Sequence, residues 1–142
     1  MLSNTNNLDK LIVTSNDAYV LFRDEINKLG SQEGIFLLPL GKNGEVLNKP
    51  TLISLGTSIG IASVKLGDIL AEAYKKGAKA FIIAHNHPSG NPKPSDADLV
   101  FTNELKNICE RLENIQFVDH LIIGSPDAAG GLGFVSIMEF IP

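Results

Sequence analysis

The sequence is poor in cysteine, and Cys109 is its only one. A lone cysteine cannot form a disulfide within the chain, so the core alone must hold the fold, as is usual in a reducing compartment. Cys109 lies in an amphipathic stretch, where we expect a small buried side chain rather than a nucleophile. One cysteine also excludes the zinc site of nucleoside deaminases, which requires a Pro-Cys-x-x-Cys pair.

The sequence also lacks an excess of positive charge and a long apolar run. A formal net charge of −4 argues against a broad nucleic-acid-binding surface, which needs clustered lysine and arginine. No apolar run approaches the ~20 residues that a membrane helix needs. Residues 1–7 lack the basic and apolar blocks of a secretory signal. We therefore expect a cytoplasmic protein that contacts neither membrane nor nucleic acid directly.

The 142 residues are predicted to form a single α/β domain. Its core spans about residues 15–140, and the polar residues 1–10 are expected to be loose. Apolar periodicity predicts three helices, over 17–29, 64–76 and 96–112. Short apolar runs predict strands over 35–40, 80–84, 118–123 and 134–137. This order of elements predicts a mixed β-sheet flanked by about three helices.

Local signals refine these elements. Ser15 or Asn16 is predicted to cap the first helix. Pro39 has no backbone N–H, so its strand is expected to lie at a sheet edge or to bulge there. An Asn-Gly turn within 42–45 predicts a hairpin whose second strand runs over 46–55, either continuously or with a break at Pro50. Small residues over 56–63 and the glycine-rich stretch 125–133 are predicted to be loops.

The residues that carry chemistry are His85, His87 and Asp98. Side chains two apart in extended backbone point the same way, so the two imidazoles can face one point just beyond the strand 80–84. Ser95 and Asp98 match a helix-capping pattern that puts Asp98 in the first turn of the third helix. Two imidazoles and a carboxylate are typical of catalytic zinc sites that leave a fourth position for water. Alternatively, the histidines are hydrogen-bonded loop residues and Asp98 is a helix N-terminal acid.

The spacing His85-x-His87, seven residues, Ser95, two residues, Asp98 resembles the JAMM motif of JAB/MPN metalloproteases. The wider string over 84–90 is similar to the RadC branch of that family. The similarity covers about residues 31–140 and includes three further segments, 32–33, 119–124 and 134–136. It implies a JAB/MPN, cytidine-deaminase-like fold. It also implies that His85, His87 and Asp98 hold Zn2+, which activates water to cleave a peptide or isopeptide bond in a protein or peptide substrate.

The resemblance also implies two catalytic residues. Glu33 corresponds to the general base, whereas composition alone would not rank it above other glutamates. Ser95 corresponds to a donor to the developing oxyanion, although a plain helix N-cap is the alternative. His120 is expected to be a core histidine, or one that supports the ligands, because a fourth ligand would close the water position. Asp96 is expected to be a solvated acid.

Two functions follow from these residues. The leading one is a zinc-dependent peptidase or isopeptidase of the JAMM type. The alternative is a non-catalytic, metal-binding RadC-like domain that acts as a protein-interaction module in DNA repair or mobile-element processes. A metal-dependent nuclease is disfavoured, because phosphoryl transfer favours carboxylate-rich sites with hard cations. Fuller RadC proteins carry an N-terminal helical region, for which this length leaves no room. The sequence sets neither the substrate nor the oligomeric state.

Overall fold

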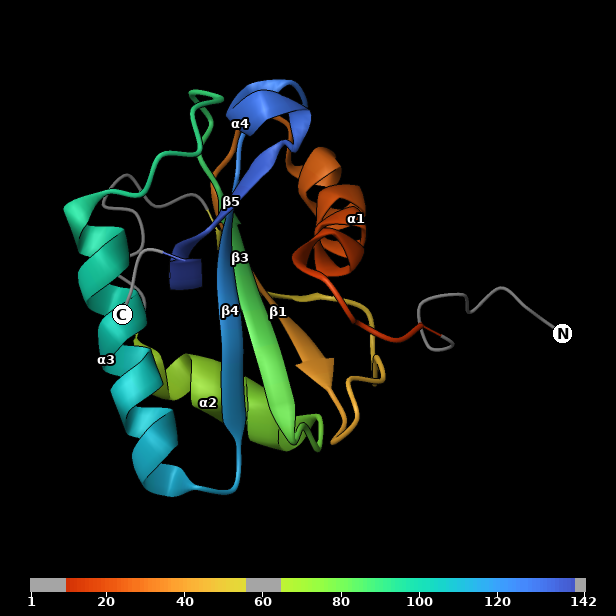
Figure 1. Cartoon of the computed structure of the whole chain (residues 1–142), viewed down its shortest axis with the longest axis vertical. Coiled ribbons are helices and arrows are strands. Elements are labelled where there is room, and N and C mark those ends of the chain that lie inside the picture. The colour runs from red at the N-terminus through yellow and green to blue at the C-terminus, as the bar shows by residue number, and fades with distance from the viewer. Residues whose placement is uncertain (1–9, 56–64, 140–142) are drawn as a thin grey trace, which may run out of the picture.

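A five-stranded mixed sheet runs through the middle of the protein (Figure 1). The computed structural model describes residues 10–55 and 65–139. In the order β2-β1-β3-β4-β5, strands β3 and β4 run parallel and the other neighbours run antiparallel. The strands are β1 (Gly34–Leu40), β2 (Thr51–Leu55), β3 (Ala80–Asn86), β4 (Gln116–Ile123) and β5 (Phe134–Ser136). The predicted α/β class with a mixed sheet is therefore confirmed.

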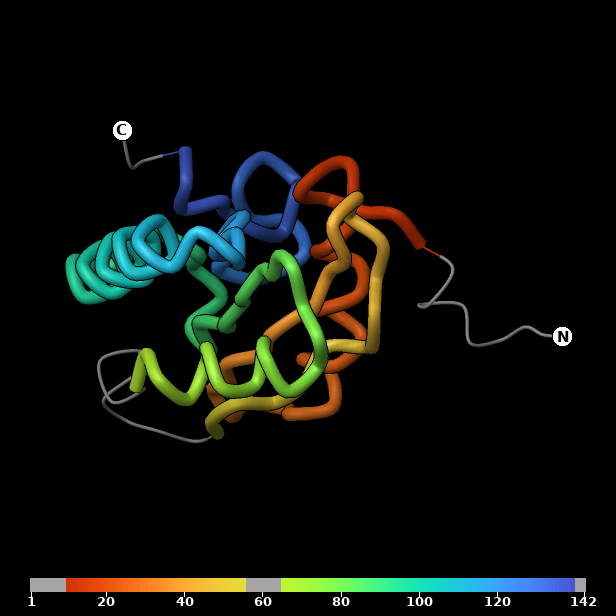
Figure 2. The backbone as a smooth tube through the Cα atoms, turned by 90° about the horizontal axis from the view of Figure 1, so that it is seen from below, coloured from red at the N-terminus to blue at the C-terminus, as the bar shows by residue number. Residues whose placement is uncertain are grey.

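Helices cover both faces of the sheet. Helix α1 (Ser15–Ile26) packs on one face, and α2 (Leu66–Lys75) and α3 (Asp96–Leu112) lie on the other (Figures 1 and 2). Strands β1 and β3 are central, and all seven residues of each are buried. Burial on both faces explains why these two strands read as continuous apolar runs in the sequence.

Helix α1 begins at Ser15, two residues before the predicted start, and its cap differs from the prediction. Its N-cap is Thr14, whose hydroxyl oxygen accepts from the backbone N–H of Asp17. The Asp17 carboxylate in turn accepts from the backbone N–H of Thr14, which completes a capping box. The prediction of Ser15 or Asn16 as the cap is therefore wrong. The last residues of the predicted helix form the 3-10 turn η2 (Asn27–Leu29).

The predicted hairpin is present, and its second strand has the form with a break at Pro50. Gly44 adopts a φ of 85°, which suits the turn, and Leu40 and Val46 form an isolated bridge beyond it. Regular pairing with β1 then resumes only in β2, so the strand predicted over 46–55 is limited to its last five residues.

Pro39 lies on β1, which has β2 on one side and β3 on the other and so is not an edge strand. The pairing of β1 with β2 ends at Leu37 and Thr51, so no backbone N–H is required of Pro39 on that side. The irregularity in the register falls between Ile35 and Phe36 instead. Neither predicted position for this proline, an edge strand or a bulge at the residue itself, is therefore correct.

The remaining boundaries differ by a few residues. Helix α2 is shorter than the predicted 64–76, and the loop predicted over 56–63 lies outside the described residues. The loop over 125–133 contains the short turn α4 (Ala128–Gly131), and β5 is followed by the 3-10 turn η4 (Ile137–Glu139). None of the helices in the described ranges has the length and apolar content needed to cross a membrane.

Cys109 is buried on the inner face of α3, as predicted. Burial raises the pKa of its thiol to about 11, which keeps the thiol protonated and unreactive at neutral pH.

Asp119 joins several elements to β4. Its buried carboxylate accepts from the hydroxyls of Ser15 (3.2 Å) and Ser136 (2.7 Å), and from the backbone N–H of Met138 (3.4 Å). Burial raises the pKa of Asp119, and these donors oppose that rise. One side chain therefore connects the start of α1, strand β5 and turn η4 to strand β4.

We predict that Asp119→Ala lowers the free energy of unfolding by about 2–3 kcal/mol, because it leaves buried donors without an acceptor. Chemical denaturation followed by circular dichroism measures this. Asp24→Ala removes an exposed carboxylate of α1 and should change stability by less than about 0.5 kcal/mol. Equal stabilities for the two variants would contradict a joining role for Asp119.

Candidate metal centre

The end of β3 and the start of α3 bring His85, His87 and Asp98 together. The Nε2 atoms of His85 and His87 lie 3.3 Å from Oδ1 and Oδ2 of Asp98, respectively. The structure differs from the prediction in one respect, because β3 continues to Asn86 and so includes His85. Alternation along this extended backbone turns both imidazoles toward α3.

This spacing fits a metal ion. In a tetrahedral site with metal–ligand distances of about 2.0–2.2 Å, the donor atoms lie about 3.3–3.6 Å apart. The ligand atoms of the three residues all lie within 4.8 Å of one another. The Nε2 atom of His85 is buried and has no hydrogen-bond partner among the described residues. A buried polar atom without a partner is rare and costly, and a bound cation would remove that cost.

Asp98 is held by the capping box of α3. Ser95 is the N-cap, and its hydroxyl oxygen accepts from the Asp98 backbone N–H at 3.1 Å. Oδ2 of Asp98 accepts from the Ser95 backbone N–H at 2.9 Å. Burial opposes ionisation of Asp98, but the imidazoles of His85 and His87, when protonated, outweigh it and hold the pKa of Asp98 well below its usual range. The carboxylate is therefore charged and fixed in place.

His87 is oriented by the proline-rich loop. Its Nδ1 donates to the backbone carbonyl of Asn91 at 2.9 Å, which leaves Nε2 facing Asp98. Its backbone N–H donates to the carbonyl of Ile123, where β4 ends. The contact with Asp98 raises the pKa of His87, and burial opposes the rise. The His87 side chain is 21% exposed, so it forms the open side of the triad.

A second row of buried groups lies behind His85. Nδ1 of His85 is 2.8 Å from Nε2 of His120, and Nδ1 of His120 is 2.7 Å from the hydroxyl oxygen of Thr102. The Thr102 hydroxyl also donates to the backbone carbonyl of Asp98 at 2.7 Å. Burial lowers the pKa of His120 well below its usual range. His120 thus contacts the candidate ligand His85 rather than Asp98, which is the arrangement expected for a supporting histidine.

The pairing of β1 with β3 brings Glu33 near His87. Ile35 and His85 are the last paired residues, and Glu33 and His87 each lie two residues beyond that pair, at the same end of the two strands. Residues two apart on a strand share a face, so Glu33 is on the face that carries the imidazoles. Glu33 is half-buried, and its charge contributes to raising the pKa of His87.

Asn86 holds the backbone on both sides of Glu33. Its side-chain oxygen accepts from the Gly34 N–H at 2.8 Å, and its side-chain nitrogen donates to the Gln32 carbonyl at 2.9 Å. Asn86 points to the opposite face from the histidines on either side of it. Sequence reasoning missed this role, because the partners of Asn86 are backbone groups more than 50 residues away.

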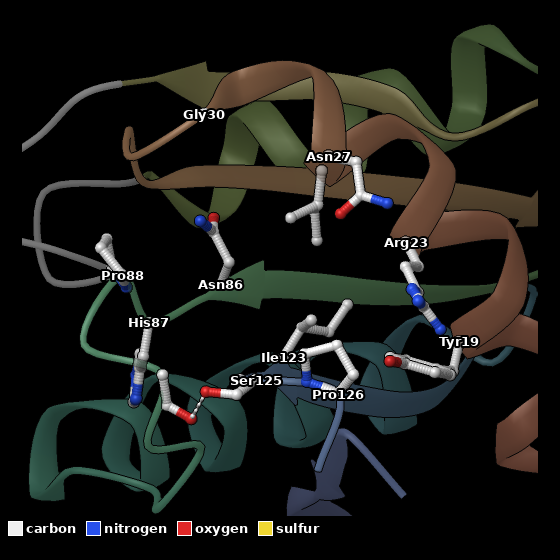
Figure 3. A pocket seen from close by; sticks show the side chains of 13 residues that line it. Tyr19, Arg23, Asn27, Gly30, Asn86, His87, Pro88, Ile123, Ser125 and Pro126 are labelled. Atoms are coloured by element: carbon white, nitrogen blue, oxygen red, sulfur yellow. Dashed lines mark hydrogen bonds between the residues drawn. The ribbon is translucent and has the colours of Figure 1, made fainter. Parts of the chain in front are cut away.

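A hollow of about 320 Å³ lies on the α1 side of β3 and reaches His87 (Figure 3). Tyr19 and Arg23 line its far wall, with the Arg23 guanidinium 5.9 Å from the Tyr19 ring centre. Near His87, the Ser125 hydroxyl donates to the Gly90 carbonyl and closes the wall between two loops. The hollow meets the triad only through His87, because the other two members lie on the α3 face.

The family comparison agrees with this geometry. A family model described as the RadC-like JAB domain matches residues 8–136. The chain belongs to the RadC-like JAB domain family. The match spans β1 to β5, and with them all three members of the triad.

Curated relatives of this RadC-like JAB domain carry the name UPF0758 protein. The one from Carboxydothermus hydrogenoformans is 40% identical over 108 residues, which cover 76% of this chain and 46% of the relative. The Bacillus pumilus relative is 40% identical over 111 residues, covering 77% of this chain and 45% of its own. The Actinobacillus pleuropneumoniae relative is 37% identical, with coverages of 78% and 48%. The chain thus spans about half the length of the curated relatives it matches.

The capping box yields a prediction for Ser95. We expect Ser95→Ala to lower the free energy of unfolding by about 1 kcal/mol, because the first turn of α3 loses a side-chain acceptor. Ser95→Thr keeps the hydroxyl and should retain most of that stability. Thermal and chemical unfolding of the three proteins measure the effect. A fully stable alanine variant would show that the hydroxyl does not support the helix.

Proposed function

We propose that this domain is a zinc-dependent hydrolase that cleaves a peptide or isopeptide bond. The observation that carries the proposal is the buried Nε2 of His85, which has no hydrogen-bond partner in the part of the chain that the structure describes. The Nε2 atoms of His85 and His87 each lie 3.3 Å from an Asp98 carboxylate oxygen. Two imidazoles and one carboxylate are the donor set of catalytic zinc sites, in which a fourth position stays open. Family membership supports the same chemistry, because JAMM motifs belong to metalloproteases.

When bound, zinc would supply the Lewis acid that lowers the pKa of a water molecule toward ~7. In this proposal Glu33 is the general base, which takes the proton from the attacking water and returns it to the leaving amine. The Ser95 hydroxyl oxygen accepts a hydrogen bond from the Asp98 N–H. In this proposal the hydroxyl proton of Ser95 donates to the developing oxyanion. The cap and the catalytic donor thus use different atoms of one hydroxyl.

The substrate in this proposal is a protein or peptide that approaches over His87. His85 and Asp98 have side chains that are 1% and 3% exposed, so the exposed edge of His87 is the accessible side. The hollow beside His87 has room for part of the substrate chain (Figure 3). The alternative function, a metal-binding interaction module, uses the same triad without turnover.

We further propose a cytoplasmic location, which fits the single cysteine of the sequence.

Metal analysis and amide cleavage test this proposal together. We expect wild-type protein purified without added metal to hold about one zinc per chain by mass spectrometry, and Asp98→Ala to lose it. Asp96→Ala removes an exposed acid from the same helical turn and should keep the metal. A peptide library from a proteome digest serves as the substrate, and new amino termini identify the cleaved bonds. Cleavage should stop with a chelator and return with zinc.

The outcomes separate the two functions. Zinc without cleavage of either the linear library or lysine-branched peptides would reject the hydrolase and leave the interaction module. Absence of zinc from wild-type protein would reject both.

The proposed base has its own test. Glu33→Gln should keep zinc and lower turnover by at least ~100-fold, because the variant cannot accept the proton. Glu110→Gln, an exposed residue of α3, should be unaffected. Asn86→Ala should keep zinc but lower kcat by about 10- to 100-fold, since it releases the backbone that carries Glu33. Normal turnover of Glu33→Gln would remove Glu33 from the mechanism.

A further inference from the structure

Two buried side chains, those of His120 and Thr102, connect His85 back to Asp98. From His85 Nδ1 the contacts run to His120 Nε2, from His120 Nδ1 to the Thr102 hydroxyl, and from that hydroxyl to the Asp98 carbonyl. The three distances are 2.8, 2.7 and 2.7 Å, so each is a short hydrogen bond. His120 and Thr102 are both fully buried, and no step of the proposed hydrolysis uses either of them.

The direction of these bonds follows from the threonine. A carbonyl oxygen can only accept, so the single proton of the Thr102 hydroxyl goes to Asp98. The bond between Thr102 and His120 therefore needs a proton on His120 Nδ1. A second proton on the same ring would place a charge at a fully buried position whose ring nitrogens bond, among the described residues, only to the His85 ring and the Thr102 hydroxyl, which is costly. Nε2 of His120 is then an acceptor.

The acceptor role of His120 Nε2 also determines which nitrogen of His85 carries the proton. With His120 Nε2 accepting, the proton of their shared bond belongs to His85 Nδ1. The remaining nitrogen of His85, Nε2, then carries a lone pair. This agrees with the lack of a hydrogen bond at Nε2 among the described residues, although Asp98 Oδ1 lies 3.3 Å away. A metal ion requires that lone pair.

We propose that Thr102 and His120 are positioning residues that fix the tautomer of His85, so that its Nε2 lone pair faces the metal site before any metal binds. The value of this tautomer for zinc rests on the proposed function, but the tautomer itself belongs to the metal-free protein. In His87 a single hydrogen bond, from Nδ1 to the Asn91 carbonyl, places the proton on Nδ1 in the same way. Partners that orient a metal-ligating histidine typically change metal affinity by about 10- to 100-fold when removed.

Nuclear magnetic resonance of metal-free protein tests the proposal directly. Long-range nitrogen–hydrogen spectra of protein with 15N-labelled histidine, recorded at pH 8, distinguish a proton on Nδ1 from one on Nε2. We expect His85 and His120 of the wild type each to carry it on Nδ1. A wild-type His85 with its proton on Nε2 would overturn the proposal, and this measurement requires neither a variant nor an active enzyme.

Variants of Thr102 test the consequence for zinc. Thr102→Val keeps the shape but removes the hydroxyl, so the His85 tautomer should become mixed and the Kd for zinc, measured against a competing chelator, should rise about 10- to 100-fold. Thr102→Ser keeps the hydroxyl and should restore both readouts. Thr51→Val, in β2, is the control for removing a threonine hydroxyl elsewhere. An unchanged His85 tautomer in folded Thr102→Val would reject the role of Thr102.

These readouts separate this proposal from the hydrolase. If wild-type protein cleaves no amide, the proposed hydrolase function is rejected. The tautomer of His85 and the zinc Kd still test the positioning role of Thr102 and His120. If Thr102→Val does not fold, the wild-type spectrum alone supports or overturns the assignment.

Discussion

The hydrogen bonds that begin α3 are the interaction on which the site depends. A helix leaves its first N–H groups without partners inside the helix, and here Ser95 and Asp98 satisfy them reciprocally. The same bonds prevent the Asp98 carboxylate from turning away from the histidines. One turn later, Thr102 bonds to the Asp98 carbonyl and fixes the ring of His120. The geometry around His85 is therefore a consequence of how one helix starts.

The sequence predicts the fold well where burial is continuous, as in β1 and β3, and where the apolar residues recur at helical spacing, as in α3. Boundaries are missed where a buried residue is polar. His85 and Asn86 belong to β3, but their polarity ends the apolar run by which the strand was recognised. The cap of α1 is missed for a related reason. Thr14, Ser15 and Asn16 are all good caps, and only the position of Asp17 relative to Thr14 decides between them.

The candidate site is predictable in part. His85, His87 and Asp98 follow from local spacing, since a strand and a capped helix both have regular geometry. Glu33 follows only from resemblance, because its nearness to His87 depends on the pairing of β1 with β3. Asn86 and Thr102 carry no local signal, as their roles arise from groups on other elements. Sequence patterns describe neighbours along the chain, and tertiary packing supplies the supporting groups.

The triad spans two layers of the fold, with its imidazoles on a strand and its carboxylate on a helix. A cation held there would connect the sheet to the first turn of α3, so occupancy and folding would be thermodynamically linked. At a concentration 100 times its Kd, such a ligand adds about 2.7 kcal/mol to the folded state. In cells short of the metal, the protein would thus lack its ion and also be less stable. Its proteolytic turnover would then rise as the metal supply falls.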